Sequence, residues 1–168
     1  MNLKELSRVL DEIPNENVDK LEKLIGSVQE VFLIGNGGSN GIASHMAVDY
    51  VKFLHKRCYV PTATDMMSMI VNDYGSLEMY SQFVKYYYSS DIKQLAILIS
   101  SSGNSMNVVN VAHTCIELEI PMIILSGFDE LNPLNQIKSD LVKLRYWVNS
   151  KSYGVVEMAH HSFLHVIV

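Results

Sequence analysis

Two pairs of histidine and carboxylate residues could hold a metal ion or move protons. His45 and Asp49 are four residues apart and would share one face of a helix. Glu157 and His165 are eight residues apart, just over two turns, and would also share a face, with His161 between them. Imidazole favours Zn, Ni, Cu or Fe, and carboxylates widen the choice to Mn. The same groups could serve as general acid and base, or be ordinary hydrogen-bonded or exposed helix residues.

A glycine-rich loop could bind an anion beside the first pair. The segment GNGGSN follows an apolar run that ends at Ile34. Its glycines allow positive φ and close approach of the backbone, and Ser39 could cap the helix that follows. Free amide groups at the start of such a helix favour an anion.

A serine-rich loop has the same placement after a second apolar run. The segment SSSGNSMN follows Ile99 and brings four hydroxyl groups around Gly103 and Asn104. Both loops could be plain strand-to-helix turns, in which Gly, Asn and Ser are common. Neither is a Rossmann or Walker motif, so the pair favours a small phosphorylated metabolite over a dinucleotide or nucleoside triphosphate.

The elements that must position these residues alternate along the chain. Apolar runs at 31–34, 95–99, 122–125 and 141–144 are separated by segments of helical periodicity, and RCYVP near Tyr59 could add a fifth strand. Residues 1–28 predict a helical hairpin, and VVEMAHHSFLHVIV predicts a closing helix cut off in mid-pattern. We therefore expect a single domain over 1–168, with a flavodoxin-like α/β core over 29–168. This core is a three-layer sandwich around a doubly wound, parallel five-stranded sheet that binds ligands beyond the carboxyl ends of its strands.

Composition narrows the classes of partner. The chain has 168 residues, 48% of them apolar, and a formal net charge of −5. No basic block alternates with aromatic residues, so we expect no nucleic-acid partner. No apolar run approaches the roughly 18 residues that span a bilayer, and no signal-peptide pattern opens the chain, so we expect a soluble, cytoplasmic protein without a membrane partner. Cys58 and Cys115 have no CxxC spacing and are expected to be reduced core residues.

The sequence resembles the SIS (sugar isomerase) domain family, and within it the phosphoheptose isomerase branch. The resemblance rests on GNGGSNGIASHMAVDYV, VNDYGSLEMYSQFV and LISSSGNSMNVVNVAHTCIELEIPMIILSG, in that order. It implies a homotetramer with active sites between subunits, acting in heptose biosynthesis for lipopolysaccharide or capsule. The implied reaction interconverts sedoheptulose 7-phosphate and D-glycero-D-manno-heptose 7-phosphate by an enediol proton shuttle.

The resemblance also implies roles for individual residues. The phosphate would be held by the serine loop, and the sugar would be lined by residues of the glycine turn and of an NDY triplet. A divalent metal, zinc by preference, would be held by residues of the first-loop helix and the last helix. Asp49 would be the base, or Glu157 if Asp49 binds the metal, with His165 as the acid. The implied sets are, for phosphate, Ser100, Ser101, Ser102 and Ser105; for sugar, Asn36, Gly37, Gly38, Ser39, Asn72 and Asp73; for metal, His45, Asp49, Glu157 and His165.

Three departures from the family pattern leave a second function open. Asp49 stands where the family has Glu, Glu157 where it has Gln, and Gly154 where it has an acidic residue. A base one methylene shorter sits roughly 1 Å farther from its proton, which can cost on the order of a hundredfold in rate. The alternative is a non-catalytic SIS-domain protein that binds a phosphosugar or acts as a replication-initiator-binding scaffold. Turnover of sedoheptulose 7-phosphate separates the two.

Overall fold

A parallel sheet forms the centre of the protein. The computed structural model describes residues 2–168. Five strands pair in the order β2-β1-β3-β4-β5, all parallel. Their bounds are β1 Glu30–Gly35, β2 Arg57–Tyr59, β3 Gln94–Ser100, β4 Met122–Gly127 and β5 Val142–Val148. This is the doubly wound, flavodoxin-like order, which confirms the predicted fold class.

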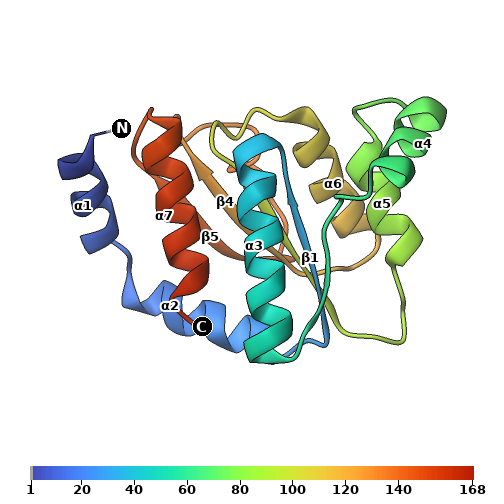
Figure 1. The fold of residues 1–168 in the computed structure, drawn as a ribbon, viewed down its shortest axis with the longest axis horizontal. Helices are drawn as coiled ribbons and strands as arrows, with labels where there is room; N and C mark the ends of the chain where they lie inside the picture. Colours follow the sequence, from blue (N-terminus) through green and yellow to red (C-terminus); the bar gives the residue numbers. More distant parts are fainter. Residues whose placement is uncertain (1) are drawn as a thin grey trace.

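Within residues 2–168, seven helices cover the two faces of the sheet (Figure 1). They are α1 Leu3–Asp11, α2 Asn15–Gly26, α3 Gly37–Leu54, α4 Thr64–Tyr74, α5 Met79–Tyr87, α6 Met106–Glu117 and α7 Tyr153–His165. One apolar cluster joins α1, α2, α3 and α7 to one face, and a second joins α4, α5 and α6 to the other. The result is the expected three-layer sandwich.

Helices α3 and α7 lie side by side on the first face (Figure 1). Each follows a strand of the same parallel sheet, so they run in the same direction and residues early in one helix face residues early in the other. The N-terminal helices complete this face, α1 against α7 and α2 against β5. The pairing of α3 with α7 determines which predicted site residues can meet.

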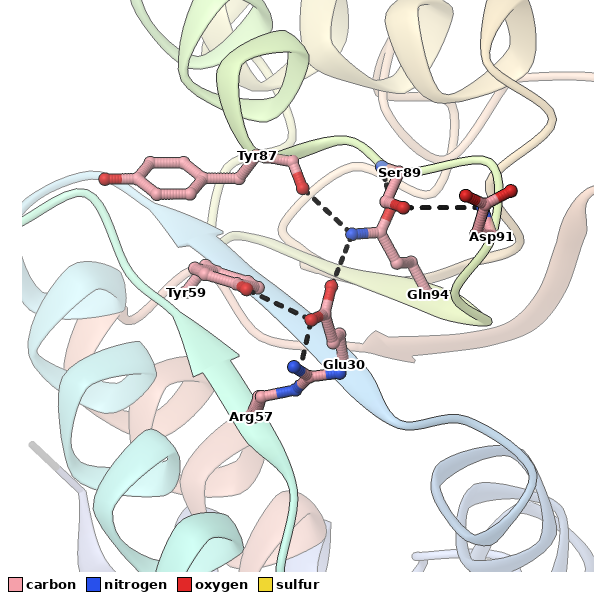
Figure 2. Close-up of polar contacts among 7 residues, drawn as sticks. All are labelled: Glu30, Arg57, Tyr59, Tyr87, Ser89, Asp91 and Gln94. Atoms are coloured by element: carbon pink, nitrogen blue, oxygen red, sulfur yellow. Dashed lines mark hydrogen bonds and ion pairs between the residues drawn. The ribbon is translucent and has the colours of Figure 1, made fainter.

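The amino end of the sheet contains a buried carboxylate network (Figure 2). Glu30, 2% exposed, has Oε1 3.1 Å from both Arg57 Nε and the Tyr59 hydroxyl, and Oε2 accepts from Gln94 Nε2 over 2.6 Å. Gln94 also donates to the carbonyl of Tyr87 and accepts from the amide of Ser89. These bonds tie the short edge strand β2 to β1 through Arg57 and Tyr59, and β1 to β3 through Gln94.

Two further findings concern the sequence expectations. Within residues 2–168, no helix is long and apolar enough to cross a membrane. Cys58 and Cys115 are free thiols, Cys115 buried and Cys58 half-buried, and burial raises the pKa of each to about 12. Both thiols are therefore protonated at neutral pH.

Candidate active site

The glycine turn lies where β1 ends and α3 begins. Gly35 has no room for a side chain, since a Cβ there would lie 2.8 Å from Ser39 Cβ and 3.0 Å from the carbonyl oxygen of Ile99. Gly37 has φ +50°, in the left-handed region that glycine tolerates best. The residue before the helix is Asn36, so the expectation that Ser39 caps α3 is wrong. Ser39 lies within the first turn of α3, because the helix already begins at Gly37, and it is buried.

The serine loop lies beside this turn, between β3 and α6. Ser100 Oγ and Ser105 Oγ are 3.2 Å apart and hydrogen-bonded. Gly103 has φ +67°, and its amide donates to the carbonyl of Ser100. Ser101 is 4% exposed, and its Oγ has no hydrogen-bond partner among residues 2–168. A buried hydroxyl without a partner is uncommon and is expected to meet a ligand or water.

The two loops enclose one pocket at the carboxyl ends of β1 and β3. Its volume is about 270 Å³, and it is lined by the glycine turn, the serine loop and two residues of α7. The lining is Asn36, Gly37, Gly38, Ser39, Ile99, Ser100, Ser101, Ser102, Ser105, Tyr153 and Glu157. The structure thus brings together the four serines and four of the six residues expected around the sugar.

Glu157 reaches this pocket from α7 through direct contact with Gly38. A Cβ built on Gly38 would lie 2.4 Å from Glu157 Oε1 and 2.7 Å from Oε2. The glycine therefore admits the carboxylate to the pocket wall. This places one ionisable group in the wall of the pocket that the two loops line.

A hydrogen-bonded amide pair forms the rim of the glycine turn. Asn36 Nδ2 donates to Asn107 Oδ1 over 2.9 Å, and Asn107 Nδ2 donates to Asn36 Oδ1 over 3.0 Å. The Tyr80 hydroxyl lies 2.7 Å from the carbonyl of Gly35 and 2.8 Å from Asn36 Oδ1, and burial raises the pKa of Tyr80 to about 12. Sequence reasoning missed Tyr80, Asn107 and Tyr153. Only Asn107 carries a signal, as the residue that ends SSSGNSMN.

Farther along α3 and α7, three residues form a compact donor group. Asp49 Oδ2 lies 3.1 Å from His45 Nε2 and 3.2 Å from His165 Nε2. One ligand atom from each of these residues lies within 4.8 Å of the other two. Two imidazole nitrogens and a carboxylate oxygen this close fit a divalent transition metal.

Glu157 does not belong to this group, although the sequence predicted that it would. Eight residues of α7 separate it from His165, a rise of about 12 Å along the helix. Its carboxylate is instead held against Gly38. Helical spacing put the two residues on one face but could not tell which turn of α3 each would meet.

Two other histidines of α7 lie near these groups. His160 is fully buried, donates from Nε2 to the carbonyl of Ser126 over 3.0 Å, and has its pKa lowered to about 4 by burial. His161 packs its ring edge against His45, with centroids 4.6 Å apart. Burial, and then the charges of His45 and His165, lower the pKa of His161. Because its pKa is about 4, His160 is neutral at pH 7.

Comparison with known proteins identifies the family. A model described as the SIS domain matches residues 3–127. The chain belongs to the SIS-domain family. The phosphoheptose isomerase of Syntrophotalea carbinolica is 27% identical over 175 residues, covering 96% of this chain and 86% of that protein. The enzyme of that name from Colwellia psychrerythraea is 32% identical over 107 residues, covering 60% of this chain and only 53% of its relative.

Solved structures agree on the fold of this SIS domain. The phosphoheptose isomerase from Neisseria gonorrhoeae superposes with a TM-score of 0.86 at 24% identity, covering 98% of this chain and 91% of that one. The NanR protein of Vibrio vulnificus, complexed with ManNAc-6P, has a TM-score of 0.69 at 15% identity and covers 98% of this chain and 56% of that one. At these identities the likeness establishes the shared architecture.

Two expected sugar contacts of the SIS domain lie away from the pocket. Asn72 and Asp73 are near the end of α4, both exposed, and Asn72 Nδ2 donates to Asp73 Oδ1 over 2.9 Å. The pocket lining within residues 2–168 does not include them. A single copy of the chain therefore does not bring the NDY triplet to the serine loop.

Proposed function

We propose that this SIS domain is an aldose–ketose isomerase of the phosphoheptose isomerase type, which interconverts sedoheptulose 7-phosphate and D-glycero-D-manno-heptose 7-phosphate. The observation that carries the proposal is that one pocket is lined both by four serines and by Glu157, whose carboxylate lies against Gly38. One wall can hold a phosphate and the other can move a proton. Its similarity over 96% of its length to a protein named phosphoheptose isomerase supports the choice of substrate.

The serine loop would bind the phosphate. The unpartnered hydroxyl of Ser101 and the amides at the start of α6 offer donors to an anion. In a heptose 7-phosphate the phosphate is at the opposite end of the carbon chain from C1 and C2. Anchoring it at the serine loop would direct the reacting carbons away from that loop, toward the α3–α7 pair.

Glu157 would be the catalytic base. Asp49 already contacts two imidazoles through one oxygen, which leaves it poorly placed to take a proton from carbon, whereas Glu157 lines the pocket. The base would remove the proton from the carbon next to the carbonyl, and an acid would protonate the carbonyl oxygen to give the enediol. His165, about two turns farther along α7, would be that acid for a sugar that extends from the pocket along the α3–α7 pair. Reversing both transfers on the neighbouring carbon would complete the isomerisation.

A divalent metal, zinc by preference, would be held by His45, Asp49 and His165. When bound, such a cation supplies polarisation of the carbonyl oxygen, the role that His165 would otherwise fill. The donor group is half-exposed, with His45 and His165 side chains 51% and 49% accessible, so substrate oxygens could approach it.

The active form would be a homo-oligomer, a tetramer, with sites between subunits. Asn72 and Asp73 do not reach the pocket of their own chain, so a second copy would have to present them. On α3, Val48, Val51 and Phe53 expose half or more of their surface next to the donor group, which is more apolar area than a free helix face needs.

The test is conversion of sedoheptulose 7-phosphate followed by NMR. The wild type should turn it over, and Glu157→Gln should lose on the order of a hundredfold or more in kcat. Glu22→Gln, an exposed carboxylate on α2, is the matched control and should leave kcat unchanged. An equally active Glu157→Gln variant would exclude Glu157 as the base.

A binding protein without turnover is the second candidate. It is favoured by the shorter Asp49, which two histidines already hold, and by the separation of the donor group from the pocket lining. This function predicts that sedoheptulose 7-phosphate binds to the protein and is not converted in the same assay. A replication-initiator-binding scaffold would show neither.

A further inference from the structure

The donor group has a fourth neighbour that the proposed function does not use. His161 is four residues before His165, just as His45 is four residues before Asp49, so each helix presents two metal-ligating side chains one turn apart. The His161 ring centroid is 4.6 Å from that of His45 and 5.9 Å from that of His165. The His45 and His165 rings are 5.7 Å apart. Three imidazole rings thus lie together at this point of α3 and α7, and two of them, His45 and His165, contact the Asp49 carboxylate directly.

One ring nitrogen of His161 needs an explanation. Its Nε2 is buried, and nothing in the described part of the chain hydrogen-bonds to it. Unpaired polar atoms at buried positions cost free energy, and native proteins keep few of them without a ligand, ion or water. Its neighbours are the other donors of the group, so a cation bound among them is the ligand that this imidazole could share.

Glu157 cannot take the same place without leaving the pocket. Its two oxygens both lie within 2.7 Å of the position of a Cβ on Gly38, and its backbone is about 12 Å along α7 from that of His165. His161 is only about 6 Å along the helix from His165. The helix pair therefore offers an imidazole, and not a second carboxylate, as the fourth group.

We propose that His161 is a ligand of the divalent cation held by His45, Asp49 and His165, so that this chain binds its metal through three imidazoles and one carboxylate. Glu157 then remains in the substrate pocket as the base. The set favours Zn²⁺ or Co²⁺ over Mg²⁺ and Ca²⁺, which prefer oxygen ligands. This inference rests on the metal assigned under the proposed function, but not on turnover of any sugar.

The experiment is a Co²⁺ titration of metal-free protein, with affinity measured by chelator competition and imidazole ligands counted by X-ray absorption. His161→Ala should weaken Co²⁺ binding on the order of tenfold to a hundredfold and remove one imidazole from the count. Glu157→Gln should bind as the wild type does. His113→Ala, an exposed histidine on α6, is the matched control. His161→Gln keeps most of the side-chain volume, and a thermal melt of each variant verifies folding.

The inference would be overturned by wild-type affinity and imidazole count in a folded His161 variant, or by no Co²⁺ binding by the wild type. A loss in Glu157→Gln as large as that in His161→Ala would also overturn it. Turnover is scored separately. If Co²⁺ affinity depends on His161 but sedoheptulose 7-phosphate is not converted, the inference stands and the proposed function fails. If conversion occurs and affinity ignores His161, the proposed function stands and the inference fails.

Discussion

The two ends of the sheet treat buried polar groups in opposite ways. At the amino end, the Glu30 carboxylate and the Gln94 amide satisfy each other and their neighbours (Figure 2). At the carboxyl end, Ser101 Oγ is equally buried and lacks a partner anywhere in residues 2–168. Both ends have a pocket, and the one at the amino end is larger, about 370 Å³ against 270 Å³.

On the proposed function, spare hydrogen-bonding capacity and not pocket size distinguishes the ligand site. The larger pocket is lined by Gln94, whose amide is already bonded to Glu30, Tyr87 and Ser89. A ligand there would have to compete with these bonds. In the smaller pocket the Ser101 hydroxyl has no partner among residues 2–168, and the Glu157 carboxylate lies in the wall beside Gly38. We therefore expect substitutions in the first region to change stability and those in the second to change ligand binding.

His160 tests the limits of that comparison, because it is buried near the carboxyl end but lines no part of the smaller pocket described above. Burial lowers the pKa of His160 to about 4, below the ordinary value of 6.5 that it regains on unfolding. Between these pH values only the unfolded chain binds the proton. The contribution of His160 to the free energy of unfolding is therefore fully present above pH 6.5 and is lost as the pH falls toward 4. The loss should reach about 3 kcal/mol.

Urea unfolding at pH 7.5, 6, 5 and 4 measures this loss. His160→Gln, whose amide can still donate to the carbonyl of Ser126, should be less stable at pH 7.5 but should lose less on acidification. Identical pH slopes for the two proteins would show that other groups cause the acid sensitivity.

Gly38→Ala should separate function from stability at the carboxyl end. The new methyl group would lie 2.4 Å from Glu157 Oε1 and displace the flexible carboxylate, which should reduce kcat/KM for sedoheptulose 7-phosphate on the order of a hundredfold. Stability should not fall, because alanine favours a helix over glycine by about 0.5–1 kcal/mol. Gly41→Ala, also on α3 but with open space around it, should keep full activity. Equal kinetics for the two variants would remove Glu157 from the mechanism.

Glu30→Gln should have the reverse effect at the amino end. The new amide would direct an N–H group toward another donor, Gln94 Nε2, Arg57 Nε or the Tyr59 hydroxyl. We expect a loss of about 2 kcal/mol in the free energy of unfolding, with kcat unchanged. Urea denaturation measures the loss, and the exposed Glu22→Gln is the control. A fall in kcat at full stability would mean that the two ends are coupled.

The sequence predicted the sheet well because buried parallel strands are continuous apolar runs. The weakest prediction was the last strand, expected at 141–144 and observed as β5 Val142–Val148. It is an edge strand, so exposed Lys143 and half-exposed Arg145 interrupt its apolar pattern. The two loops were predicted because their chemistry is local: glycine for close approach, serine for hydroxyl groups.

Contacts between helices could not be predicted in the same way. Spacing on one helix fixes a face but not the partner residue on another, which is why Glu157 was grouped with His165 and is found against Gly38. Tyr80 reaches Asn36 from α5, on the other side of the sheet from α7, and no local pattern marks it. These features depend on how the helices pack.

Ser101→Ala has the smallest expected effect, and its direction is opposite to that of most substitutions because it should increase stability. Its hydroxyl is buried without a partner, so removing it should raise the free energy of unfolding of the ligand-free protein by about 1 kcal/mol. Ser105→Ala removes a hydroxyl that bonds to Ser100 Oγ and should lower stability by about 1 kcal/mol. Thermal melts without ligand and with inorganic phosphate measure both effects, and phosphate should raise the Tm of the wild type more than that of Ser101→Ala. If Ser101→Ala is destabilised as much as Ser105→Ala, its hydroxyl has a structural partner and the two ends of the sheet are alike.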